Sequence, residues 1–342
     1  MRVNDNSWRP SYWLSIIMVA YNSENTIEYA LKSIRSQSMD QNQIELLVLD
    51  GGSSDRTVEL AHKYNAVVLH NEAKLPEPGK IKGMQCAHGK YVLIMDSDEE
   101  LPTKTILQDR YDFLEKYDYL HCISIGTVNP PNYNPIGKYI NAVGDPFSCF
   151  VYRTYKLGMN KLIWDKNTLD SKEYCIGKFG ETDIRPIGDS GVMMDMEYIH
   201  RMYPEQMQVE NTTAIFDNII RDTGYVGCIL CDDHIHRSKS DFRTYLKKLK
   251  FRVVNNVHNV ESSGYGARSQ SSRKLTARKF LFPLYVITII PTIFDGVRMS
   301  INYSSPVFML HPVFAWYVLV EILHQYFLKI ISHKQTIDVY GE

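Results

Sequence analysis

Three short groups of polar residues each follow an apolar run, and their side chains suit the binding of a phosphate, a base or a metal. The groups are Tyr21-Asn22, Asp50-Gly51-Gly52 and Asp96-Ser97-Asp98. Side chains alternate along an extended chain, so Asp96 and Asp98 point to one side and Ser97 points away. Two carboxylates on one side offer the oxygen ligands that Mg²⁺ or Mn²⁺ prefers. An ion there would neutralise the charge on a departing diphosphate, whereas the plainer alternative is an acidic turn that starts a helix.

The elements that must position these groups alternate along the first hundred residues. Continuous apolar runs predict strands over 15–21, 44–50, 66–70 and 91–96, since strands covered on both faces carry such runs. Apolar stripes at helical spacing predict helices between them, the first beginning after Ser23 as its cap. Strand and helix in alternation indicate an α/β protein with a mainly parallel sheet. Ligands bind beyond the carboxyl ends of such strands, where all three polar groups fall.

Composition narrows the class of protein. The chain has 342 residues, 44% of them hydrophobic, and a formal net charge of −1. These values exclude collagen-like, disordered and disulfide-scaffold proteins and give no reason to expect a nucleic-acid partner. The near-neutral total hides a segregation, because 12 Lys or Arg and only two acidic residues lie between Arg237 and Lys279, a net charge of +10.

The three blocks 15–22, 45–57 and 79–101 resemble, in order and spacing, the beginning of a family 2 glycosyltransferase with the GT-A fold. The resemblance covers about the first hundred residues closely and the next hundred loosely. It implies an inverting transfer from a nucleotide-sugar donor, linked to UDP or GDP, with Mg²⁺ or Mn²⁺ as cofactor. Gly51 departs from the family pattern, which commonly has an aspartate there.

The resemblance also implies roles for individual residues. Asp98 is expected to be the direct metal ligand, with Asp96 near the ribose or metal. Independently of the resemblance, His234 and His236 lie where a later loop could reach the diphosphate, and His236 is expected to be a further metal ligand, although the alternative is a structural His pair. The residues expected to border the donor are Ala20, Tyr21, Asn22, Asp50, Lys80, Asp96 and Ser97.

A hydroxyl acceptor needs a base to take its proton. By the resemblance, that base is an aspartate about a hundred residues after the metal motif, and the closest match is Asp195, although Met194 replaces the usual glutamate. Asp183 and Asp189 are competing candidates. A phosphate acceptor, such as a polyprenyl phosphate, is already anionic and needs no strong base.

Two other readings stay open. Cys228 and Cys231 lie close in sequence to His234 and His236, a pairing that can bind zinc, although the spacing matches no standard structural site. The incomplete base motif also suits a catalytically silent, membrane-attached carbohydrate-binding or scaffold protein of the same fold. A dinucleotide-binding oxidoreductase is disfavoured because no G-x-G-x-x-G follows the first strand.

The end of the chain carries the membrane signal. Residues 280–294 and 306–331 are apolar, and basic residues flank both runs. Two arrangements fit: a hairpin of two membrane helices with both ends in the cytosol, or helices that lie in the interface. With six scattered cysteines and no signal peptide at the beginning, we expect a cytoplasmic catalytic part at a membrane surface, acting on a lipid-linked or glycan acceptor.

The expected organisation has four parts. Residues 1–110 form the donor-binding half and 111–236 the acceptor-binding half of the GT-A domain. Residues 237–279 form a basic juxtamembrane segment with an amphipathic helix over 241–254, for which Ser240 is the expected cap. Residues 280–342 form hydrophobic C-terminal helices.

Overall fold

A computed structural model describes residues 8–152, 163–180, 191–205, 213–238, 241–258 and 277–332. Its first hundred residues form four strands: β1 (Tyr12–Ala20), β2 (Ile44–Asp50), β3 (Val67–His70) and β4 (Gly89–Asp96). All four are parallel, in the order β3-β2-β1-β4. This confirms the predicted strands and their common direction.

The large sheet continues beyond β4 with shorter strands of mixed direction. They are β9 (Met193–Asp195), β6 (Cys122–Ile123), β10 (Tyr225–Ile229) and β8 (Tyr174–Lys178), in that order. β9 is antiparallel to both β4 and β6, whereas β10 is parallel to β6. A second small sheet joins β5 (Glu99–Glu100), β11 (His234–His236) and β7 (Thr127–Val128).

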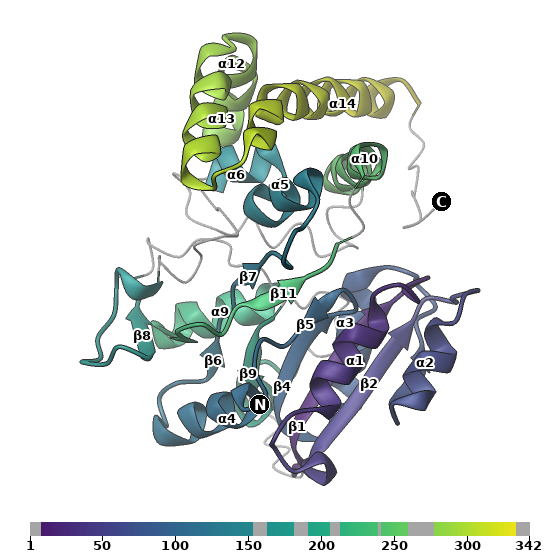
Figure 1. Ribbon diagram of the computed structural model, residues 1–342, viewed down its shortest axis with the longest axis vertical. Helices are drawn as coiled ribbons and strands as arrows, with labels where there is room; N and C mark the ends of the chain where they lie inside the picture. Colours follow the sequence, from purple (N-terminus) through teal and green to yellow (C-terminus); the bar gives the residue numbers. More distant parts are fainter. Residues whose placement is uncertain are drawn as a thin grey trace.

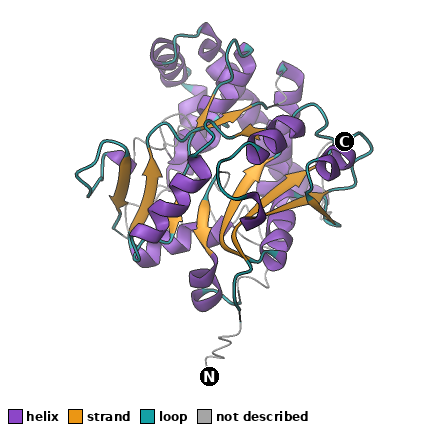
Figure 2. Ribbon diagram, turned by 60° about the horizontal axis from the view of Figure 1, so that its bottom comes forward, coloured by secondary structure: helices purple, strands orange, loops and turns teal. Residues whose placement is uncertain are grey.

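Helices cover both faces of the large sheet (Figures 1 and 2). Both faces of the sheet are apolar and need covering, as alternate residues of β1 illustrate. Ile16 and Met18 pack into one hydrophobic cluster and Ile17 into another. The first cluster includes residues of α1 (Ile27–Arg35), α2 (Thr57–Lys63) and α4 (Ile106–Lys116). The second includes residues of α3 (Pro76–Cys86), α8 (Met196–Met202) and α9 (Thr213–Thr223).

The first helix begins differently from the prediction. Its N-cap is Thr26, and the Ser23 hydroxyl donates to the carbonyl oxygen of Tyr21 at 3.2 Å. Ser23 thus stabilises the turn after β1 and does not cap α1. The residues between β1 and the helix are thereby fixed at the carboxyl edge of the sheet.

A third hydrophobic cluster lies at one end of the long axis (Figure 1). It joins α5 (Pro135–Val143), α6 (Pro146–Tyr152) and α10 (Phe242–His258) to the C-terminal helices. The C-terminal helices are η4 (Arg278–Leu281), α12 (Phe282–Ile287), α13 (Ile290–Asn302), η5 (Pro306–Leu310) and α14 (His311–Ser332). A further 3₁₀ turn, η1 (Gln41–Gln43), precedes β2 in the large sheet. Because α5 and α6 precede residue 237 in the chain, this cluster packs together residues from both sides of the part boundary expected there. Ser240, the expected cap of α10, lies outside the described residues.

Candidate functional site

The register of the parallel strands brings the three polar groups to one edge. Ala20 of β1 is paired with Asp50 of β2, and Val19 is paired with Asp96 of β4. Each strand therefore ends within one residue of its neighbour. The predicted meeting of these groups at the carboxyl edge is confirmed by this register.

Hydrogen bonds from backbone N–H groups to side-chain oxygens hold the turns that follow β1 and β2. Asn22 adopts a left-handed backbone with φ of 46°, and its side-chain oxygen accepts from the Ser54 N–H at 2.9 Å. The Asp50 carboxylate accepts from the N–H groups of Gly52 and Ser53 at 2.9 and 3.0 Å. Asp50 therefore has a definite structural role in this turn, alongside the donor contact that the resemblance implies for it.

The space beside Gly51 is taken by an aromatic ring. A β-carbon on Gly51 would lie 3.3 Å from Cδ2 of Tyr21. This tight approach accounts physically for a glycine where the resembled family commonly has an aspartate. It also places Tyr21 directly against the second polar group.

The side chains of the third group diverge as their alternation predicts. Ser97 is buried and donates to the Ser23 hydroxyl at 3.0 Å, inside the turn after β1. Asp98 is turned toward His236, whose Nε2 lies 3.3 Å from the carboxylate oxygen. The backbone holds this pair in place, because β5 pairs with β11 and the Arg237 N–H donates to the Asp98 carbonyl at 2.6 Å.

The hydrogen bonds of Asn141 define the state of the His236 ring. The Asn141 amide nitrogen donates to the Asn129 side chain at 2.9 Å and to the His236 carbonyl at 3.1 Å. Its oxygen therefore accepts from Nδ1 of His236, at 2.7 Å. With one proton on Nδ1, the ring presents the lone pair of Nε2 to the Asp98 carboxylate in its neutral form, and in its protonated form it donates to that carboxylate. Two lone-pair-bearing atoms facing each other suit a cation between them, and a second hydrogen bond of this kind is usual for a metal-binding histidine.

The expected set of three metal ligands is only partly assembled. The structure brings Asp98 and His236 together, but nowhere in the described ranges do three or more His, Cys, Asp or Glu side chains lie close enough to hold one ion. The zinc reading of the Cys228 region fails for the same reason: Cys228 is buried in β10 and Cys231 is exposed. A divalent ion at Asp98 and His236 would need oxygens from a substrate to complete its coordination.

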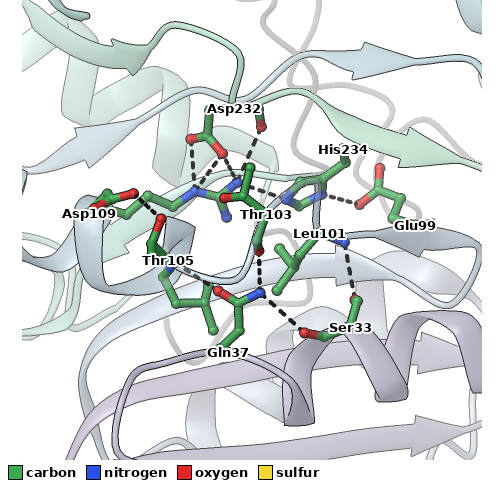
Figure 3. Close-up of polar contacts among 11 residues, drawn as sticks. Ser33, Gln37, Glu99, Leu101, Thr103, Thr105, Asp109, Asp232 and His234 are labelled. Carbon is green, nitrogen blue, oxygen red and sulfur yellow. Dashed lines mark hydrogen bonds and ion pairs between the residues drawn. The ribbon is translucent and has the colours of Figure 1, made fainter.

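A chain of buried polar side chains links Asp232 and His234 to Glu99, the residue after the Asp96–Asp98 turn (Figure 3). Arg110 of α4 is fully buried and donates to both carboxylate oxygens of Asp232. It also donates to Nε2 of His234 at 3.0 Å, so the proton of that ring is on Nδ1 and reaches Glu99 at 3.1 Å. Glu99 in turn accepts from the backbone N–H of Asp96 at 3.2 Å. Burial raises the pKa of Asp232, and the Arg110 guanidinium acts against that shift.

Lys80 lies on the helix that borders the end of β1. A β-carbon on the preceding Gly79 would lie 3.1 Å from Val19, so this turn of α3 rests against the carboxyl edge of the sheet. The Lys80 side chain is buried, and its ammonium lies 3.4 Å from Glu77. Its place at this edge is compatible with the predicted contact to a donor.

The prediction of Asp195 as catalytic base does not fit the structure. Asp195 is paired with Tyr91 near the beginning of β4, about 16 Å along the strand from Asp96 at ~3.3 Å per residue. Its carboxylate caps α8 by accepting from the Tyr198 N–H and forms an ion pair with His121 at 2.8 Å. The error arises because β9 is antiparallel to β4, so its last residue lies at the opposite edge. The competing Asp183 and Asp189 lie outside the described residues.

Three further residues of the site escaped prediction: Arg110, Asp232 and Asn141. Arg110 stands in an amphipathic helix that looks like any surface helix, and Asp232 is 122 residues away along the chain. The one usable signal is the arginine on the apolar side of α4, where Ile106, Leu107, Phe113 and Leu114 are also buried.

The fold and the edge site together define the class of protein. The mixed sheet, covered by helices on both faces and carrying carboxylates at its carboxyl edge, is the GT-A fold, as expected. A family model described as glycosyl transferase family 2 matches residues 15–178. This part of the chain, which contains the whole Asp50, Asp96 and Asp98 region, belongs to that family.

Among curated relatives, the poly(ribitol-phosphate) beta-N-acetylglucosaminyltransferase TarS of Staphylococcus aureus is 32% identical over 109 residues, which are 30% of this chain and 19% of TarS. The cholesterol galactosyltransferase of Borreliella burgdorferi is 24% identical over 175 residues, 45% of this chain and 47% of that protein. The chain thus spans less than half the length of these relatives. Among solved structures, the mannosyltransferase PcManGT from Pyrobaculum calidifontis, in complex with GDP-Man and Mn²⁺, has a TM-score of 0.55 at 14% identity, covering 93% of this chain and 88% of PcManGT. That likeness supports the fold.

Proposed function

We propose that the protein is an inverting, metal-dependent glycosyltransferase that moves a sugar from a UDP- or GDP-linked donor to a lipid-linked or glycan acceptor at the cytosolic face of a membrane. The observation that carries this proposal is the Asp98–His236 pair at the carboxyl edge, where the ends of β1, β2 and β4 meet. Family membership of residues 15–178 supports the donor class.

The donor would lie along this edge. Asp50, Asn22 and Tyr21 would border the base and ribose, and Lys80 would face the phosphates from α3. Asp98 and His236 would hold Mg²⁺ or Mn²⁺ together with the diphosphate, with Asp96 beside them. The ion supplies positive charge against the negative charge that develops on the departing diphosphate.

The transfer itself is an in-line displacement at the anomeric carbon. The bond from that carbon to the diphosphate oxygen breaks as a bond to the acceptor oxygen forms, and a hydroxyl acceptor gives up its proton. Since Asp195 lies at the other edge of the sheet, it does not receive this proton. The two curated relatives act, by their names, on poly(ribitol phosphate) and on cholesterol, which supports a hydroxyl-bearing acceptor, either a polymer or a lipid.

The test is donor turnover by the purified full chain with Mn²⁺ and a panel of UDP- and GDP-sugars, measured as released UDP or GDP. We expect at least one donor to be consumed, and Asp98→Asn to lower the rate about 100-fold or more, because metal charge stabilisation amounts to several kcal/mol. Asp118→Asn, an exposed aspartate after α4, is the matched control and should keep full activity.

Two results would count against the proposal. Metal-independent turnover, equal in wild type and Asp98→Asn, would remove the metal assignment. No turnover of any donor, together with no thermal stabilisation by donors plus Mn²⁺, would instead favour the catalytically silent reading.

A further inference from the structure

The C-terminal helices expose most of the large hydrophobic side chains of the described protein. Of 26 such exposed residues, 19 lie between Phe280 and Ile331. These helices occupy one end of the long axis, away from β1, β2 and β3 (Figure 1). Monomeric soluble proteins seldom expose so much contiguous apolar surface without using it for binding.

The outer face of α14 carries an apolar stripe, which is bordered by the exposed His324, paired with Glu321 at 3.7 Å. Its residues recur every three or four positions, the spacing of one helix face, and each is 38–75% exposed. They are Val313, Trp316, Val320, Leu323, Phe327 and Ile330. The opposite face, with Phe314, Ala315, Val318 and Leu319, is buried against the protein. Packing of α14 against the rest of the protein therefore does not explain the apolar residues on its outer side.

The charged residues of α14 lie off this stripe and have polar partners. Glu321 accepts from the Gln325 amide at 2.7 Å. Lys329 donates to the Val257 carbonyl at the end of α10, at 2.6 Å. Neither charge interrupts the outer stripe.

The packing of α10 along α14 decides between the two membrane arrangements. The rings of Phe242 and Phe314 lie 5.5 Å apart near the beginnings of the two helices, and Val257 meets Lys329 near their ends. The two helices thus run side by side in the same direction. An α14 that crossed the bilayer would carry the exposed Lys247 and Lys250 of α10 into the hydrocarbon, which is costly. Length and composition alone would permit Pro306–Ile331 to span, and the pair Arg278–Ile287 and Ile290–Asn302 is bent by 91°.

We propose that α14 lies in the plane of one leaflet of an anionic membrane, with its outer stripe buried at the boundary between headgroups and acyl chains. Exposed basic residues of α10 and η4 supply the attraction to anionic headgroups; among them are Arg243, Lys247, Lys250 and Lys279. Trp316 on the stripe suits this depth, where tryptophan is enriched. The inference refines the membrane part of the proposed function but depends on no catalytic step.

The test uses the purified full chain and sedimentation with vesicles of phosphatidylcholine, with or without 30% phosphatidylglycerol. We expect binding to the anionic vesicles, at least tenfold weaker binding to the neutral ones, and release by alkaline carbonate, as for a protein that does not span. The double change Leu323→Glu and Phe327→Glu should weaken binding at least tenfold. Leu230→Glu is the control, because Leu230 is 53% exposed, close to the 60% of Leu323, but lies outside the C-terminal helices.

Several outcomes would overturn the inference. Unchanged binding by the folded double variant would exclude the stripe, and resistance of the bound protein to alkaline carbonate would show a spanning helix. A dimer in solution that the same double change dissociates, without vesicle binding by the wild type, would assign the stripe to a second copy of the chain. Asp98→Asn should bind vesicles normally, so a failure of membrane docking is distinguishable from a failure of the proposed catalysis.

Discussion

Replacing Asp232 by asparagine would remove the negative charge from an ion pair that lies wholly inside the protein. The side chains of Arg110 and Asp232 are 0% and 1% exposed and share three hydrogen bonds. Asparagine has nearly the same shape, so the change leaves the Arg110 guanidinium buried without a counter-charge. Removing one partner of such a pair costs about 3–5 kcal/mol of folding free energy. We expect a loss of that size for Asp232→Asn.

Urea denaturation at pH 7 measures this loss as a lower midpoint at an unchanged slope. The double variant Arg110→Met with Asp232→Leu replaces both charges by apolar groups and should lose much less than the sum of the two single variants, because neither charge is then left unpaired. The control is Glu59→Gln, which breaks the exposed pair of Arg56 and Glu59 on α2 and should leave the midpoint unchanged. A loss below about 1 kcal/mol for Asp232→Asn, or simple additivity in the double variant, would refute the reasoning.

Three further predictions concern separate parts of the molecule. Asn141→Leu should weaken Mn²⁺ binding about 10–100-fold in a calorimetric titration, because it removes the hydrogen bond that orients the His236 ring. The control Asn256→Leu on α10 should leave the affinity unchanged, and equal affinities of the two variants would contradict the role of Asn141. Gly83→Ala should cost about 1–3 kcal/mol by urea denaturation, because its β-carbon would lie 2.4 Å from a β1 side chain, while Gly180→Ala, with nothing within 4 Å, should be neutral. Burial lowers the pKa of His311 to about 4, so the unfolded chain binds its proton more readily. Stability should therefore be complete above about pH 6.5 and fall by about 3 kcal/mol as the pH drops to 4, and a variant His311→Gln should lack this loss; an equal loss in that variant would contradict it.

The parallel half of the fold was predictable because its signals are local. Strands such as Ile44–Asp50 are continuous apolar runs, and their ends coincide with turn residues. Once the strands are parallel, their carboxyl ends must meet, so the edge site follows from the sequence without knowledge of any contact.

The antiparallel half was not predictable in the same way. β9 has only three residues, Met193–Asp195, and so short a run does not indicate whether the strand is parallel or antiparallel to its neighbours. A reversed strand moves its last residue to the other edge of the sheet, which is why Asp195 fails as the base. Likewise, the ion pair of Arg110 and Asp232 forms only because two segments far apart in the sequence meet in the fold, and no local sequence pattern predicts that contact.

One short helix, α5, connects the edge site to the C-terminal helices. Tyr139 and Asn141 are two positions apart on α5, so they point roughly 200° apart around its axis. Asn141 accepts from His236, while the Tyr139 hydroxyl bonds Nδ1 of His311, the first residue of α14, at 2.7 Å. Both residues are fully buried, so neither bond is relaxed by water. A shift of α14 along its axis would therefore strain α5 and displace the residue that fixes the His236 ring. The distance from the outer stripe of α14 to the Asp98–His236 pair is thus set by packing inside the protein. If α14 lies on a membrane as proposed, this packing holds the pair at a constant height above the membrane surface.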